Sequence, residues 1–119
     1  MTKDTAYRST RGFRVHSYLR EGATVVECHG KLTAENAPLL RSEVRNIIPN
    51  QKRIILDLKE VPLMDSAGLG TIVGLYVSAR TRHCPLELMN ANQRIRELFG
   101  ISNLVSLFEA AGRHGGKMM

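Results

Sequence analysis

Hydrophobic and polar residues alternate near the beginning of the chain, and this pattern predicts strands. Residues 13–20 carry apolar side chains among polar ones with the period of a strand that has one buried face. A second strand is predicted over residues 24–29, and the turn at Glu21 and Gly22 between them is short, so an antiparallel hairpin is expected. The residues of the first strand expected to be buried are Phe13, Val15 and Leu19.

Farther along the chain, apolar residues recur three and four positions apart, which is the spacing of the buried side of a helix. Helices are predicted over residues 36–48, 66–80 and 92–100, and strands over 53–58 and 85–89. Asn92 is expected to cap the last helix and Gly100 to end it. The helix residues expected to be buried are Leu40, Val44, Ile47, Ile48, Leu69, Ile72, Val73, Tyr76, Ile95, Leu98 and Phe99. The strand at 53–58 is nearly continuous in Ile and Leu, which is typical of a central strand that is buried on both faces or close to it. Residues 104–108 favour a last short strand or a docking turn.

Strands and helices alternate after the hairpin, so the later strands should pair in parallel through right-handed crossovers. The predicted fold is therefore α/β: a mixed sheet of four to five strands, with an N-terminal antiparallel hairpin followed by parallel β-α units, and helices packed mainly on one face. A chain of 119 residues fits one such domain, expected at residues 12–109. A flexible basic arm at 1–11 and a flexible tail at 110–119 would flank it.

The stretch from Leu63 to Gly70 lies where a predicted strand and loop lead into a predicted helix. Asp65 and Ser66 occupy the start of this helix, and either side chain could accept hydrogen bonds from its first backbone N–H groups. Gly68 and Gly70 each reduce helix stability by roughly 1 kcal/mol relative to Ala. A reason other than stability is therefore expected for them, such as a bare surface that another protein can approach.

Three stretches of the chain carry recognisable motifs. They are Gly30 to Ala37, the hexapeptide Asp65-Ser66-Ala67-Gly68-Leu69-Gly70 after the loop Val61-Pro62-Leu63-Met64, and the weaker run Asn92 to Phe99. Together they resemble the bacterial STAS domains that act as anti-sigma factor antagonists, and the resemblance covers about residues 12 to 109. It implies the same small mixed sheet with helices packed against it.

The resemblance also implies a function for Ser66, which matches the serine phosphorylated in that family. The unphosphorylated domain would bind an anti-sigma factor and free a sigma factor for transcription. Phosphorylation of Ser66 by that partner, a serine kinase that uses ATP, would end the complex, and a phosphatase would reset it. The partner-binding residues implied are Leu63, Met64, Asp65, Ser66, Ala67, Gly68, Gly70 and Thr33.

Specific roles are expected for four of these positions. Asp65 would orient the Ser66 hydroxyl, and Gly68 and Gly70 would let the partner approach closely. Thr33 stands where the family often has an acidic residue. A phosphate on Ser66 would add roughly −1.5 to −2 charges at a helix N-terminus, where the helix dipole favours an anion, so the helix should survive and the switch should act on binding.

Other readings of the same residues stay open. Ser66 could be a helix cap and nothing more, and the domain could be a constitutive scaffold or a lipid-transport accessory module. A hydrolase elbow would need G-x-S-x-G, but Met64 replaces its first glycine, and no histidine has an evident orienting acid. Neither a catalytic residue nor a cofactor is therefore predicted, and no phosphate-binding G-x-x-x-x-G-K-[ST] loop is present.

Composition narrows the choice of partner. The net charge of +6 favours an acidic partner, and a basic nucleic-acid-binding domain is the alternative from another class. Its basic residues are scattered, and with three Tyr, three Phe and no Trp the chain offers no stacking platform for bases. The four histidines lack metal-ligand spacing, so no metal site is predicted.

The remaining features point to a cytoplasmic protein. No window approaches the 18 or more apolar residues of a membrane span, and the first residues have no apolar signal core. Cys28 and Cys84 are expected to be small buried side chains that stay reduced. A monomer and a weak dimer are equally compatible with the sequence.

Overall fold

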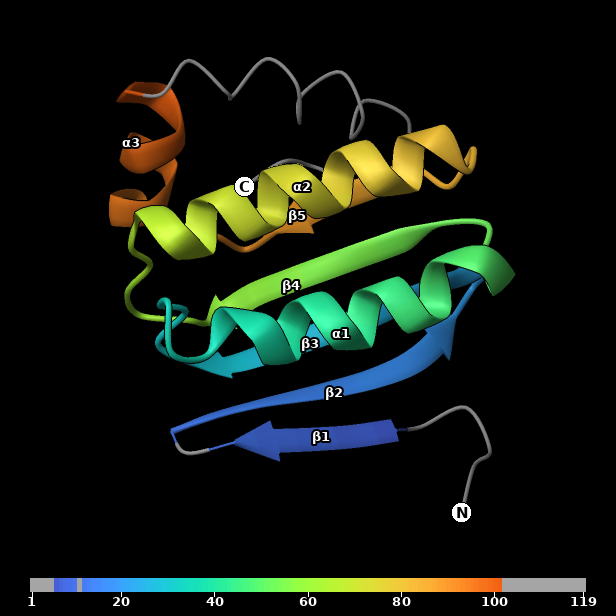
Figure 1. Cartoon of the computed structure of the whole chain (residues 1–119), viewed down its shortest axis with the longest axis horizontal. Coiled ribbons are helices and arrows are strands. Elements are labelled where there is room, and N and C mark those ends of the chain that lie inside the picture. The colour runs from blue at the N-terminus through green and yellow to red at the C-terminus, as the bar shows by residue number, and fades with distance from the viewer. Residues whose placement is uncertain (1–5, 11, 102–119) are drawn as a thin grey trace.

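The computed structural model describes residues 6–10 and 12–101, and its centre is a five-stranded sheet with the strand order β1-β2-β3-β4-β5 (Figure 1). The strands are β1 (Ala6–Thr10), β2 (Phe13–Arg20), β3 (Ala23–Gly30), β4 (Ile54–Glu60) and β5 (Leu86–Met89). The helices are α1 (Ala37–Ile47), the short 3₁₀ helix η1 (Ile48–Asn50), α2 (Ser66–Thr81) and α3 (Gln93–Ile101).

The N-terminal half of the sheet is antiparallel. β2 and β3 pair from Phe13↔Gly30 to Arg20↔Ala23, and a two-residue turn joins them. Both turn residues have positive φ, 50° for Glu21 and 84° for Gly22, as a tight hairpin turn requires. The predicted hairpin is confirmed.

The expected flexible arm is wrong for residues 6–10, which form β1. This strand pairs antiparallel with β2, from Ala6↔Ser17 to Thr10↔Phe13. The free edge of β2 offers backbone hydrogen-bonding groups to any adjacent extended segment, and such pairing needs no alternation of side chains that a sequence pattern could reveal. Residues 1–5 and 11, like the predicted last strand at 104–108 and the tail at 110–119, lie outside the described residues.

The C-terminal half of the sheet is parallel, as predicted. β3 pairs in parallel with β4, and β4 with β5. The crossover helices α1 and α2 both lie over the same face of the sheet, and α3 stands beside the start of α2 (Figure 1). Right-handed crossovers between strands that are adjacent in sequence and in space place both helices on one side.

Because only one face carries the helices, β4 is fully buried on one side and partly buried on the other. Ile54, Leu56 and Leu58 are fully buried under the helices, whereas Ile55 and Asp57 on the other face are partly exposed. The expectation of burial on both faces, or close to it, is therefore confirmed only in part. A run of Ile and Leu at 54–56 reflects strand propensity as well as burial.

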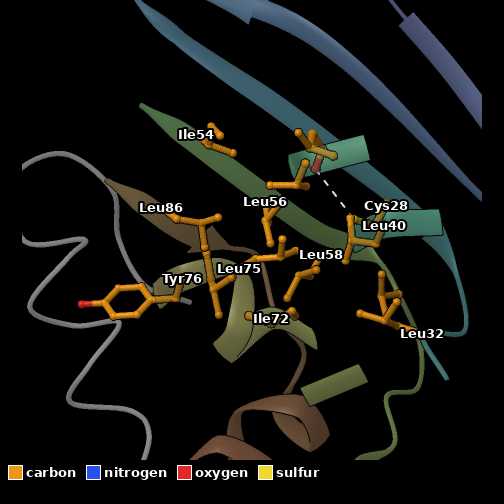
Figure 2. Close-up of a cluster of buried hydrophobic side chains, with 14 of the residues drawn as sticks. Cys28, Leu32, Leu40, Ile54, Leu56, Leu58, Ile72, Leu75, Tyr76 and Leu86 are labelled. Atoms are coloured by element: carbon orange, nitrogen blue, oxygen red, sulfur yellow. Dashed lines mark hydrogen bonds between the residues drawn. The ribbon is translucent and has the colours of Figure 1, made fainter. Parts of the chain in front are cut away.

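The core lies between the sheet and the two long helices, where Leu56, Leu58, Ile72 and Leu75 converge (Figure 2). Most of the predicted core residues are buried there, and Ile47, Val73 and Leu98 are partly buried against the core. Cys28 and Cys84 are buried free thiols, and burial raises the pKa of both. The fully buried core residues with the largest side chains are Phe99, Leu32, Leu40, Ile54, Leu56, Leu58, Ile72, Leu75, Leu86, Leu88 and Ile95.

Two local predictions are wrong. Leu19 is 51% exposed, since it lies at the end of β2 next to the hairpin turn and beyond the cover of the core. Gly100 does not end the last helix, because α3 continues to Ile101; a glycine lowers helix stability but does not forbid helical geometry. No helix within the described residues is long and apolar enough to cross a membrane.

Candidate functional site

Ser66 is the first residue of α2, and it is exposed. The residue before it, Asp65, is the N-cap: its backbone is extended, and its Oδ1 accepts a hydrogen bond from the N–H of Gly68 at 2.9 Å. The Asp65 carbonyl accepts the next backbone bond, from the N–H of Leu69 at 3.0 Å. Asp65 thus caps α2, a role for which the sequence offered both Asp65 and Ser66.

The second carboxylate oxygen of Asp65 also binds backbone. Its Oδ2 accepts from the N–H of Ala34 at 3.2 Å, in the turn that follows β3. These bonds, first the one from Gly68 and then the one from Ala34, hold the pKa of Asp65 below its ordinary value, so the side chain is an anion at neutral pH. Both carboxylate oxygens of Asp65 thus accept hydrogen bonds from backbone amides, and orientation of the Ser66 hydroxyl by Asp65 stays a prediction.

Backbone hydrogen bonds join the loop before α2 to the turn after β3. The N–H of Leu32 donates to the carbonyl of Leu63 at 2.9 Å, and the N–H of Asp65 donates to the carbonyl of Leu32 at 3.2 Å. Leu32 and Met64 form an isolated parallel bridge between these bonds. Thr33 is half-buried in the same turn, where its carbonyl accepts from the first amides of the α1 start. Two of the three motif stretches therefore meet at this corner.

The two glycines at the start of α2 face opposite surroundings. Gly68 is buried, and a Cβ added to it would lie 2.4 Å from the carbonyl oxygen of Leu32 and 2.9 Å from Cγ of Met64. A Cβ added to Gly70 would meet nothing within 4 Å, and Gly70 is exposed. The role expected for Gly68, an open approach for a partner, is wrong, because the space beside it is filled by the chain itself.

The loop before the motif is divided between core and surface. Val61 is buried, whereas Pro62 is exposed and Leu63 is 36% exposed. Met64 is buried, so among the predicted partner-binding residues it belongs to the core together with Gly68. The exposed or half-buried ones form one surface around the α2 start, consisting of Leu63, Asp65, Ser66, Ala67, Gly70 and Thr33; it is called the Ser66 surface below.

The third motif stretch reaches the same corner through Asn92. Its Oδ1 accepts from the N–H of Ile95 at 2.9 Å and caps α3, as predicted. Its Nδ2 lies 3.3 Å from the carbonyl oxygens of both Val61 and Pro62. This second function was missed, since the sequence shows a cap before a helix but not which loop lies beside it.

A family model for the STAS domain matches residues 15–117, which is most of the chain. The chain belongs to the STAS domain family. It is 35% identical over 88 residues to an anti-sigma-B factor antagonist of Listeria monocytogenes, covering 72% of this chain and 76% of the relative. An anti-sigma-B factor antagonist of Bacillus subtilis is 29% identical over 91 residues, covering 76% of this chain and 84% of the relative.

Solved structures share the STAS fold. The phosphorylated form of the Bacillus cell fate determinant SpoIIAA superposes with a TM-score of 0.64 at 21% identity, over 79% of this chain and 86% of that one. The architecture predicted from the sequence, a small mixed sheet with helices on one face, is thereby confirmed.

The face of the STAS sheet opposite the helices carries a cluster that the sequence did not reveal. The Glu27 carboxylate lies 3.4 Å from Nδ1 of His16 and 3.5 Å from Nε2 of His29, and it accepts from the Tyr18 hydroxyl at 3.1 Å. Burial alone would raise the pKa of Glu27, but the hydrogen bonds from Tyr18 and the histidines lower it. An acid does therefore stand beside these two histidines, contrary to expectation.

This cluster lies away from the Ser66 surface, on strands β2 and β3. It contains neither a serine nor a cysteine side chain that could act as a nucleophile. Among the described residues, no group of three or more His, Cys, Asp and Glu side chains is placed to hold a metal ion.

Proposed function

We propose that this chain is an anti-sigma factor antagonist whose binding to an anti-sigma factor is switched by phosphorylation of Ser66. One observation carries the proposal: Ser66 is exposed at the start of α2, while Asp65 supplies the cap. A serine whose only role were capping would be redundant here. The relatives named above are anti-sigma-B factor antagonists, and SpoIIAA, which shares the fold, has been solved in a phosphorylated form.

A phosphate on Ser66 would act on binding more than on folding. It would add roughly −1.5 to −2 charges at the first residue of α2, where the helix dipole and free N–H groups favour an anion. The ionised Asp65 beside it would make the exposed surface more negative still. A partner packed against the Ser66 surface would have to accommodate a dianion, so the complex would dissociate while the domain stays folded.

The partners follow from this mechanism. The anti-sigma factor would be a serine kinase that supplies its own ATP site, since this chain has no G-x-x-x-x-G-K-[ST] loop. In the complex it would release a sigma factor for transcription. A phosphatase acting on Ser66 would restore binding.

The test compares Ser66→Ala and Ser66→Asp as baits in native cell extract, with retained proteins identified by mass spectrometry. Ser42→Asp is the matched control, because Ser42 is an exposed residue of α1 and the charge change is the same. The alanine form and the control should retain an ATP-binding, kinase-like protein that the aspartate form loses. Purified, that protein should transfer phosphate to the wild type and not to Ser66→Ala.

The melting temperature of each bait separates lost binding from lost folding. All three variants should melt within about 2 °C of the wild type, since exposed substitutions change stability little. If the alanine and aspartate forms retain the same proteins, Ser66 is not a switch, and a constitutive scaffold becomes the better explanation.

A further inference from the structure

Two hollows lie along the junction of α1 and α2, which run over the same face of the sheet (Figure 1). The hollow nearer the Ser66 surface has a volume of about 230 Å³, and Gly70 and Gly74 line it. The other has a volume of about 270 Å³, and its lining includes Arg82. Arg45 lines both, so the hollows are neighbours along the junction, and together they are called the interhelix groove below.

The interhelix groove is positively charged. Arg41, Arg45 and Arg82 line it, and all three are exposed. No acidic residue occurs within α2, and the only one in α1, Glu43, is buried on the other side of that helix. There Glu43 binds Ser17 and Arg8, each at 3.3 Å. The helices themselves therefore supply no exposed carboxylate to neutralise the arginines.

Packing against the described residues does not explain the glycines in the interhelix groove. A Cβ added at Gly70 or at Gly74 would meet nothing within 4 Å, unlike the one at Gly68. Glycine in the interior of a helix lowers its stability, so both residues act against folding. Spaced four apart, they lie on one side of α2 and leave a bare strip. A strip without side chains lets a second backbone come close.

We propose that the interhelix groove docks an acidic helix of the partner that also binds the Ser66 surface. Carboxylates of that helix pair with the groove arginines, and its backbone packs over Gly70 and Gly74. The identity of the partner rests on the proposed function, whereas the acidic character of the docked helix rests on the groove itself. From Gly70 to its end at Thr81, α2 extends roughly 16 Å, or about three turns of a docked helix.

The lining of the interhelix groove favours a protein over a nucleic acid. Among the residues that the structure describes, no aromatic side chain lines either hollow, so bases would find none of them to stack on. Arginine pairs well with carboxylates as well as with phosphates, but three arginines along one short groove give few phosphate contacts.

The first experiment replaces groove arginines. In Arg45→Glu/Arg82→Glu two exposed groove residues reverse charge, and Arg14→Glu/Arg20→Glu at two exposed positions of β2 gives the same charge change outside the groove and away from α2. The probes are the purified kinase-like protein retained by Ser66→Ala and, independently, a synthetic helical peptide with glutamates along one side. The groove variant should weaken both interactions at least tenfold, and the control by less than twofold.

The outcomes separate this proposal from the phosphorylation switch. If Ser66→Asp abolishes partner binding but the groove variant binds like the wild type, the switch stands and the groove proposal is overturned. If the groove variant does not bind the partner and Ser66→Asp binds it normally, the groove proposal stands and the phosphorylation switch is overturned. Three results would overturn the groove proposal whichever partner is found. The first is that the glutamate peptide leaves the amide NMR signals of Gly70 and Gly74 unshifted. The others are that a lysine-bearing peptide binds as tightly as the glutamate peptide, or that duplex DNA binds this groove more tightly than that peptide does.

The second experiment fills the bare strip with methyl groups. This change should raise the stability of the domain and weaken binding of the peptide. Gly70→Ala/Gly74→Ala should raise the melting temperature by roughly 4 °C or more, since each change removes a helix-breaking residue. It should also weaken binding of the glutamate peptide at least fivefold, because the methyl groups fill the strip. Gly100→Ala on α3, where a Cβ also meets nothing, should stabilise without changing binding. Unchanged binding by the double variant would contradict the proposal.

Discussion

Glycine has a different structural role on the inward side of α2 than on its outward side. Gly68 and Gly70 are two residues apart in the same turn, yet a Cβ would collide with the Leu32 carbonyl at the first and meet open space at the second. The inner glycine is there for packing within the fold. The outer one weakens the helix without a packing contact to any other described residue, which is expected of a surface selected for binding.

Gly68→Ala should produce the largest effect. The new methyl group would force the Leu32 carbonyl away from Asp65, whose N–H donates to it at 3.2 Å, and would press on Met64. Overpacking of this kind costs typically about 1–3 kcal/mol in the free energy of unfolding. Urea denaturation of the variant and the wild type measures the loss. A variant as stable as the wild type would show that the corner is loosely packed and would remove the contrast with Gly70.

This contrast could not be read from the sequence. The helix was predicted over 66–80 and observed at Ser66–Thr81, because apolar spacing reports local burial. The function of Gly68 depends on Leu32, which belongs to a turn far away in the sequence. A glycine pair near a helix start predicts that something requires bare backbone, but only the tertiary contact tells which glycine faces inward.

The other features that the sequence did not predict have the same origin. The strand β1 is held by backbone pairing with β2, which leaves no periodic side-chain pattern to detect. Asn92 was recognised as a cap, but its bonds to the Val61 and Pro62 carbonyls depend on how α3 sits beside the loop. Glu27 pairs with His16 across the β2–β3 ladder and lies two residues before His29 on β3. The sequence pattern did not fix the register that brings Glu27 opposite His16. Local elements and most of the strand pairing were predictable, and individual contacts between distant residues were not.

Asp65→Ala tests the inner side by removing the group that joins the α2 start to the turn after β3. Loss of an N-cap carboxylate costs typically about 1 kcal/mol, and loss of the bond to Ala34 should add to it. Asp65→Asn is the matched control, since asparagine also caps helices well and should retain most of the stability. Urea denaturation compares the three proteins. Equal stability of the alanine and asparagine variants would mean that the cap contributes nothing here.

Gly70→Ala tests the outer side and should have the opposite sign. With no atom within 4 Å of the new methyl group, the change should stabilise the domain by about 0.5–1 kcal/mol through helix propensity. Thermal and urea unfolding both measure this gain. A loss of stability would show that Gly70, like Gly68, is needed for packing, and the difference between the two sides of α2 would disappear.

The smallest expected effect is a pH dependence carried by Asp65. Its pKa in the folded chain lies below the ordinary 3.8, because the backbone N–H groups of Gly68 and Ala34 favour the carboxylate. A depressed pKa contributes stability that is present above the unfolded-state pKa and is lost as the pH falls through the folded-state pKa. Solvent screening of this exposed carboxylate keeps the effect modest.

The difference in stability between the wild type and Asp65→Asn isolates this effect from every other acid that titrates, including Glu27. It should be constant from about pH 7 to pH 5 and shrink below about pH 4, as Asp65 becomes protonated and resembles the amide. Urea denaturation at each pH gives the two curves. A difference that persists unchanged to pH 3 would mean that the charge of Asp65 is irrelevant and that only hydrogen-bond geometry holds the inner side of α2 in place.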